Sequence, residues 1–315
     1  MFDSPVRLLA AVMGAVALVA APIGAALALR PSAGAGATAT PAPVASAAPA
    51  QPSVRAGFPA PPSGAVVFAR QLGADALALG VVPEHGRVLV QASVLGSQGQ
   101  GASGLPVSFA VGAARANGTA CGPGCYRATL PYAGAVDVVV RGTRWHVALP
   151  TPWPAADANA LVLHAGQAWR ALQSVTYSER LASGPRRAVT SVWRVTAPDR
   201  IAYQVRGGWA GVIVGARRWD RPPGGRWAAS AQSPVTQPQP FWVSAVDAHI
   251  LAAKTVRGRA VWEVSFFDPG TPAWFDVLLD RETLRTLELH MVTTAHFMHD
   301  VYGSFDTTPR VQPPR

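Results

Sequence analysis

Alternating apolar and polar positions predict that most of the chain after residue 63 forms β-strands. Short strand-like runs separated by turn residues recur from residue 64 to about residue 154. In the run 87–95, small apolar side chains recur at every second position, with Gln91 and Ser93 between them. This is the alternation of a sheet with one buried side. The spacing predicts an immunoglobulin-like β-sandwich over residues 63–154.

A second β-rich module begins with a helical segment. Residues 157–174 carry apolar side chains at helical spacing, among them Leu161, Ala165 and Trp169. Alternating strand-like runs then continue to residue 306, which predicts a long antiparallel sheet with one apolar face. Because one helix must cover much of that face, we expect a curved antiparallel half-barrel over residues 155–308.

A curved sheet of this kind can hold an apolar cavity, and we expect the Pro- and aromatic-rich segment 232–245 to act as its lid. An ordinary filled core is the alternative. The residues expected to line the cavity alternate along the strand-like runs and are mostly bulky. They are Trp193, Val195, Tyr203, Val205, Trp262, Val264, Phe266, Phe275 and Val277.

The amino terminus predicts export. Residues 8–29 contain no charge, are bounded by Arg7 and Arg30, and would extend about 33 Å as a helix, enough to span a bilayer. Residues 1–30 are therefore a transmembrane anchor in the cytoplasmic membrane, or a signal peptide whose cleavage would release a secreted protein. In both cases the rest of the chain is extracytoplasmic. Residues 31–62 form an Ala- and Pro-rich disordered linker, and residues 309–315 a disordered tail.

Together these segments predict a mainly β protein: an N-terminal transmembrane helix, an immunoglobulin-like β-sandwich, and a curved half-barrel with a packed helix. The two cysteines, Cys121 and Cys125, enclose a Gly-Pro-Gly turn and are expected to form a disulfide outside the cytoplasm. A redox pair or half of a metal site are the alternatives. The spacing is not the Cys-x-x-Cys of redox motifs, and no second cysteine pair is present.

Charge becomes informative once it is located along the chain. The net charge is +10, and residues 180–226 hold ten arginines against Asp199 and Asp220. Arginine suits phosphate and carboxylate groups, so this region is a candidate site for an anionic headgroup, with a solvated basic edge as the alternative. The arginines proposed for it are Arg186, Arg187, Arg217, Arg218 and Arg221. Nearby tryptophans could stack nucleic-acid bases, but an exported protein is not expected to bind nucleic acid.

The histidines offer a candidate metal site. His296, Met298 and His299 combine imidazole and sulfur ligands of the kind that suits copper, and His290 lies nearby in the sequence. Strand alternation, however, places His296 and Met298 on one face and His299 on the other. Copper therefore enters only as an alternative, and no resident cofactor is expected.

Sequence motifs for catalysis are missing. The chain contains no His-Glu-x-x-His zinc motif, no Gly-x-Ser-x-Gly nucleophile elbow and no phosphate-binding Gly-x-x-x-x-Gly-Lys sequence. We therefore expect a protein that is not an enzyme.

The order of helix, strands, Pro-rich interruption and final strands over residues 157–306 resembles the LolA/LppX-like family of envelope lipid carriers. The local likeness lies in Pro-Ala-Trp-Phe-Asp-Val at 272–277, the turn at 280–283, and Tyr-Gly-Ser-Phe at 302–305. This resemblance implies a half-open β-barrel with helical lid elements, and lipid binding. Residues 295–300, Ala-His-Phe-Met-His-Asp, also resemble exported tails of actinobacterial CopD-type copper proteins, in which a YtkA- or CopC-like sandwich precedes such a module.

The leading hypothesis is an exported, membrane-anchored protein that binds a lipid or other apolar ligand in its second module. The sandwich would position that module or recruit an envelope protein partner. An accessory copper-handling protein and a non-catalytic envelope interaction module are the alternatives.

Overall fold

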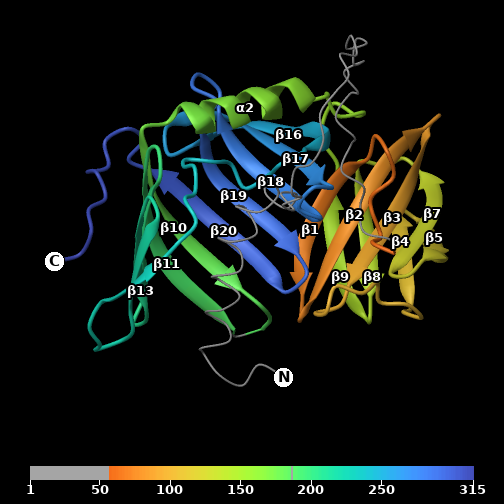
Figure 1. Ribbon diagram of the computed structural model, residues 1–315. Coiled ribbons are helices and arrows are strands. Elements are labelled where there is room, and N and C mark those ends of the chain that lie inside the picture. The colour runs from red at the N-terminus through yellow and green to blue at the C-terminus, as the bar shows by residue number, and fades with distance from the viewer. Residues whose placement is uncertain (1–56, 186) are drawn as a thin grey trace, which may run out of the picture. The chain divides into compact units, whose positions relative to one another are not determined.

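The computed structural model describes residues 57–185 and 187–315. The predicted anchor or signal peptide, the linker up to residue 56, and Arg186 lie outside the described residues. Within the described part, no helix is long and apolar enough to cross a membrane. The described residues form antiparallel sheets and one α-helix, which confirms the prediction of a mainly β protein (Figure 1).

The first module consists of two sheets that share one core. The five-stranded sheet has the order β1 (Val66–Leu72), β2 (Asp75–Glu84), β3 (Arg87–Leu95), β7 (Cys125–Pro131), β6 (Thr119–Gly122). The four-stranded sheet has the order β5 (Ala114–Asn117), β4 (Val107–Val111), β8 (Ala135–Val140), β9 (Thr143–Ala148). Apolar side chains from both sheets, such as Leu79, Val90, Phe109 and Val138, form a single buried cluster. The two-sheet arrangement follows from the alternation, whereas the immunoglobulin topology stays a prediction.

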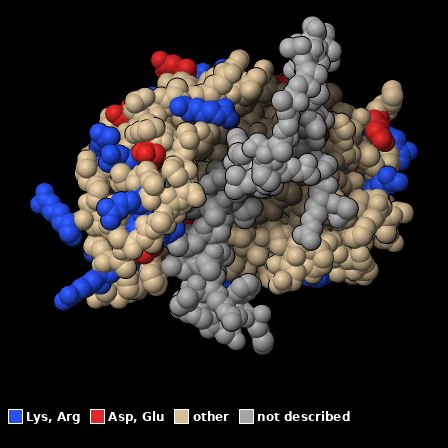
Figure 2. Space-filling model, viewed as in Figure 1, with Lys and Arg blue, Asp and Glu red and all other residues tan. Residues whose placement is uncertain are grey.

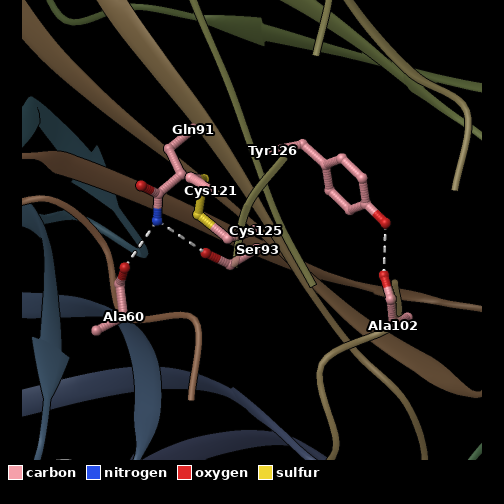
Figure 3. The surroundings of a disulfide bond; sticks show 7 residues. All are labelled: Ala60, Gln91, Ser93, Ala102, Cys121, Cys125 and Tyr126. Atoms are coloured by element: carbon pink, nitrogen blue, oxygen red, sulfur yellow. Dashed lines mark hydrogen bonds between the residues drawn. A yellow bond between two sulfur atoms is a disulfide. The ribbon is translucent and has the colours of Figure 1, made fainter. Parts of the chain in front are cut away.

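The predicted disulfide between Cys121 and Cys125 is confirmed, and it closes the turn between β6 and β7 (Figure 3). This turn packs tightly against the neighbouring backbone. Gly124 has φ +67°, and a Cβ atom there would lie 2.3 Å from the carbonyl oxygen of Val94. Only glycine fits such a position, because an L side chain would be strained and would clash. Beside the turn, Tyr126 donates its hydroxyl hydrogen to the carbonyl of Ala102 at 2.7 Å.

The second module contains one 11-stranded antiparallel sheet and the helix α2 (Asn159–Ala171). Two meanders, β10–β15 and β16–β20, join through the pairing of β10 with β20. In sheet order the strands are β15 (Ala228–Ala231), β14 (Arg217–Arg221), β13 (Ala210–Val214), β12 (Arg200–Val205), β11 (Ala188–Thr196), β10 (Ser174–Ala182), β20 (His296–Gly303), β19 (Thr286–Thr293), β18 (Ala273–Asp280), β17 (Arg259–Asp268) and β16 (Val246–Val256).

Helix α2 lies across one face of this sheet, which we call the inner face; the opposite face is the outer face (Figure 1). Trp169 on α2 packs edge-on against Tyr302, with ring centroids 5.0 Å apart, and donates its indole hydrogen to Thr286. The start of the helix is fixed to the edge strand β16, where Ala158 donates to the carbonyl of Ala248 and Asn159 accepts from its amide. These bonds occupy polar groups of an edge strand that would otherwise be open to pairing.

The outer face is buried where it meets the first module. Phe267, Trp274 and Phe297 on the outer face form one buried cluster with Val67 and other side chains of the first module. Phe58, within the predicted linker, joins this cluster and stacks on Phe267 and Trp274. The two modules therefore share a hydrophobic core, and the described residues belong to one compact unit.

Two local expectations differ from the structure. Gln91 and Ser93, expected on an exposed face of β3, are buried, and Gln91 donates to the carbonyl of Ala60 at 2.7 Å (Figure 3). The predicted disordered tail contributes a buried side chain, Val311, whose carbonyl accepts a hydrogen bond from Arg200. In both places another part of the chain covers a surface that the local pattern marks as open.

Replacement of Trp274 by alanine is expected to lower the free energy of unfolding by about 3–5 kcal/mol, since it empties a fully buried indole site between the modules. Urea denaturation followed by circular dichroism measures this change. Leu163→Ala on the exposed side of α2 is the control and should change stability little. Because the core is shared, the wild-type protein should unfold in one transition; two separate transitions would contradict the shared core.

Candidate functional site

The predicted cavity residues all lie on the inner face of the 11-stranded sheet. Their alternation along β11, β12, β17 and β18 puts them on the side that α2 covers. All are buried except Trp262, which is half-buried near the rim under the guanidinium of Arg281. The strand pairing therefore puts these side chains on one face, and their role in lining a ligand cavity stays a prediction.

Aromatic rings form two groups on this face. Tyr177, Trp193 and Tyr203 are cross-strand neighbours on β10, β11 and β12, and their successive ring centroids are 5.9 and 4.9 Å apart. On β17 and β18, Phe266 and Phe275 stack at 5.0 Å. Such rings bury large apolar areas, so the inner face presents a broad apolar wall.

The segment 232–245, for which we predicted a role as a lid, packs against this wall. It links β15 to β16 without helix or strand. Trp242 is buried and packs against Phe266 and Phe275, with centroids 5.5 and 6.3 Å apart. Phe241 packs edge-on against Tyr177 at 6.3 Å. In this structure the lid side chains themselves fill the space between α2 and the sheet.

Asp268, at the end of β17, holds the lid in place. Its carboxylate accepts hydrogen bonds from the backbone amides of Val243 at 2.5 Å and Ser244 at 3.2 Å. The same carboxylate also accepts from the amides of Gly270 and Thr271 in the adjoining turn. Further along the segment, the backbone amide of Gln237 donates to the carbonyl of Pro198 at 2.7 Å, so the segment is held by polar contacts at more than one place as well as by the packing of Trp242.

Two carboxyl groups lie opposite each other within the otherwise apolar inner face. Glu179 on β10 and Asp300 on β20 are cross-strand partners and both are buried. Glu179 accepts from the hydroxyl of Ser191 at 3.1 Å, and Asp300 accepts from the hydroxyl of Tyr302 at 2.6 Å. The Oδ1 atom of Asp300 has no hydrogen-bond partner among the described residues. It is therefore a buried polar atom whose hydrogen-bonding capacity is unused.

Burial decides the protonation of this pair. Desolvation raises the pKa of Glu179 to about 7, against a smaller opposing effect of its hydrogen bonds from Ser191 and Trp193. The pKa of Asp300 is raised well above its ordinary value by desolvation and by the charge of Glu179. Burial likewise raises the pKa of Tyr177 and Tyr302. Burial therefore favours the protonated form of both carboxyl groups, and a protonated carboxyl group can both donate and accept hydrogen bonds.

The arginines proposed for a headgroup are not gathered into one site. Arg218 points to the inner face, where it pairs with Asp220 at 2.7 Å and contacts the hydroxyl of Tyr203. Arg217 and Arg221 lie on the other side of β14 over Trp219 and Trp227. Arg187 is exposed near the β10–β11 turn, and Arg186 is outside the described residues. Basic side chains do gather toward the edge that carries β10, β11 and β13 (Figure 2).

The proposed copper ligands are also separated. Met298 is buried on the inner face, and the Nδ1 atom of His296 lies 3.1 Å from the carbonyl oxygen of Thr294. His299 points to the outer face, where it meets His290 and Glu288. The sequence placed Glu288 with His290, but the pairing of β19 with β20 was needed to bring His299 to them.

A cavity of about 320 Å³ was not anticipated from the sequence. Its walls include Arg257, Arg259 and Arg285, together with Tyr302 and Phe305. These residues come from three separate turns and the end of β20, and no local sequence signal connects them.

The sequence matches no known protein family and no curated protein. Among solved structures the chain is similar to LprF from Mycobacterium bovis, at 10% sequence identity and a TM-score of 0.38, over 53% of this chain and 99% of LprF. It is also similar to the LolA superfamily protein NE2245 from Nitrosomonas europaea, at 10% identity and a TM-score of 0.25, over 50% of this chain and 96% of that protein. A DUF1329 family protein from Desulfovibrio piger ATCC 29098 gives 8% identity and a TM-score of 0.26, over 47% and 90%.

Replacement of Glu179 by glutamine is expected to change how stability depends on pH. A carboxyl group whose pKa is raised in the folded state is protonated there while the unfolded chain has already ionised. The wild-type protein therefore loses stability as the pH rises from about 4.5 to about 7. The variant Glu179→Gln lacks the contribution of Glu179 to this loss of stability. Its free energy of unfolding at pH 8 should therefore exceed that of wild type by roughly 1–3 kcal/mol.

Urea denaturation at pH 5 and pH 8 measures the difference. Glu282→Gln, at an exposed position in the β18–β19 turn, is the matched control. Equal loss of stability in Glu179→Gln and wild type over this pH range would contradict the assignment.

Proposed function

We propose that the protein is an exported, membrane-tethered carrier or sensor that binds a lipid or another apolar ligand against the inner face of its 11-stranded sheet. The proposal rests on the kind of segment that covers this face. The segment 232–245 has no regular structure, and it packs Trp242 and Phe241 against the inner face. In an ordinary filled core, a second helix would be expected at this place.

Long irregular segments inside a compact module are uncommon, and many of them are functional lids. Helix α2 contributes only Val162, Ala165, Gly166 and Trp169 to the buried interior. The lid indole supplies the rest of the cover near Phe266 and Phe275. A Cβ added at Gly166 would lie 3.5 Å from the indole nitrogen of Trp242, which is an ordinary contact distance, so the helix and the indole ring are direct neighbours.

The ligand would enter by replacing the lid side chains. Withdrawal of Trp242 and Phe241 uncovers a wall of aromatic and β-branched side chains without breaking any strand pairing. An acyl chain or a similar apolar group restores the lost apolar contacts, so exchange between lid and ligand has a small net cost. The backbone bonds of Val243 and Ser244 to Asp268 can keep one end of the segment attached during this exchange.

The polar end of the ligand is expected to meet the Glu179–Asp300 pair. The unpartnered Oδ1 atom of Asp300 accepts a hydrogen bond, and a protonated carboxyl donates one. Hydroxyl, ester or amide groups fit these partners. Arg218 is already paired with Asp220, so an anionic headgroup is better received outside the inner face.

The N-terminal segments and the first module are consistent with a protein that delivers its ligand at an envelope surface. Residues 8–29 would anchor the protein in the cytoplasmic membrane, and the linker would let the folded unit reach about 30–100 Å from it. The first module, for which we propose an immunoglobulin-like sandwich, would orient the second module or recruit an envelope protein.

The full chain, purified from an envelope-containing host without delipidation, is expected to carry a reproducible bound lipid in native and lipid-extraction mass spectrometry. Val205→Gln places an amide on the inner face and should weaken lipid binding by about tenfold or more, about 1.4 kcal/mol. Trp242→Ala removes the competing indole and should increase lipid retention.

Val192→Gln is the matched control, because Val192 lies on the neighbouring strand but faces solvent, with 48% exposure. It should bind lipid as wild type does. A chain that carries no lipid and takes up none from phospholipid vesicles, even as Trp242→Ala, would contradict the proposal and favour a filled structural core.

A further inference from the structure

Three potential metal ligands meet on the outer face of the 11-stranded sheet, away from the proposed lipid site. Glu288 and His290 lie two residues apart on β19 and so share a face. His299 on β20 is the cross-strand partner of His290. The three groups therefore lie on two adjacent strands in the interior of the sheet.

Their geometry is compact. The Oε1 atom of Glu288 lies 3.1 Å from Nε2 of His290 and 2.9 Å from Nε2 of His299. All three ligand atoms lie within 4.8 Å of one another. Ligands about 2.0–2.1 Å from a tetrahedral zinc ion are roughly 3.3 Å apart. Coordination therefore requires the three atoms to move closer and the two imidazole rings to tilt, so that both in-plane Nε2 lone pairs point to one ion.

The two imidazoles are already aligned side by side. Their rings stack with centroids 4.1 Å apart and planes 8° from parallel. Each Nε2 atom points to the same carboxylate oxygen. Binding of a metal ion would replace the hydrogen bonds by three metal–ligand bonds and would require both Nε2 atoms to be deprotonated.

The trio is open to solvent. The exposed side-chain fractions are 50% for His290, 37% for His299 and 22% for Glu288. Glu288 also borders the 320 Å³ cavity, and His290 borders a second cavity of about 120 Å³. An ion held here would keep a coordination position for water or for a ligand from outside.

The charges nearby include both signs. Glu263 on β17 and Asp276 on β18 lie on the same face, and Asp276 is the cross-strand partner of His290. Lys254 pairs with Glu263 at 3.1 Å, and the exposed Arg180 is the cross-strand partner of His299. Counting Glu288, three acidic groups thus surround the two histidines in a chain whose net charge is +10.

We propose that Glu288, His290 and His299 bind one divalent transition-metal ion, with Zn²⁺ as the reference ion. Two imidazoles and one carboxylate are a donor set that zinc uses when it keeps a fourth position open. The site differs from the copper set considered from the sequence, because Met298 lies on the opposite face and no sulfur is present. It is also independent of lipid binding, which involves the other side of the sheet.

The test is calorimetric titration of the full chain, without a histidine tag and stripped with a chelator, with Zn²⁺ at neutral pH. We expect one ion per chain. His290→Gln and His299→Gln should each weaken binding by about tenfold or more. With Co²⁺ as the probe, the wild-type protein should show the visible absorption of a tetrahedral site and the variants should not.

His146→Gln is the matched control. His146 also contacts a carboxylate on a neighbouring strand, Asp137 at 2.9 Å, but that pair belongs to no three-ligand group among the described residues. It should leave Zn²⁺ affinity unchanged, as should Met298→Leu.

Thermal unfolding without metal verifies that every variant is folded. Absence of stoichiometric Zn²⁺ binding would overturn the proposal. So would binding that survives both His290→Gln and His299→Gln, or binding that depends on Met298.

Discussion

The pairing of β10 with β20 is the contact on which the second module depends. These strands are the first and last of the module, and their ladder from Thr176 to Ala182 joins two meanders into one sheet. Asp306, just beyond β20, accepts from the amides of Gln173 and Ser174 at the start of β10, which supports the register of the closing pair. Without this ladder, the two meanders would present separate apolar faces that neither α2 nor the lid could cover together.

The same central strands carry different chemistry on their two faces. On the inner face, the pairing of β10 with β20 sets Glu179 opposite Asp300 in an apolar surrounding, where desolvation keeps a proton on the pair. On the outer face, the pairing of β19 with β20 sets His290 beside His299 near solvent. Because β20 carries both Asp300 and His299, a shift of β20 by one residue would move each of them to the opposite face, and both groups would be lost.

The two modules depend on each other for burial. Trp274 and Phe267 on the outer face would be a large exposed apolar patch if the second module stood alone. Gln91 on β3 is covered by a different segment, the residues before β1, where it donates to the carbonyl of Ala60. The alternation of apolar and polar residues along a strand indicates which face packs against the core of its own module. It does not indicate which residues of the opposite face contact the other module, so these contacts could not be predicted from alternation.

Local order along the chain determined the strands, the helix, the disulfide and the set of side chains on the inner face, because period and turn chemistry act over a few residues. Only the tertiary structure decided the separation of the arginines, the meeting of Glu179 with Asp300, and the trio Glu288, His290 and His299. Each of these depends on which strands pair and in what register, and that is set by long-range burial and not by any segment alone.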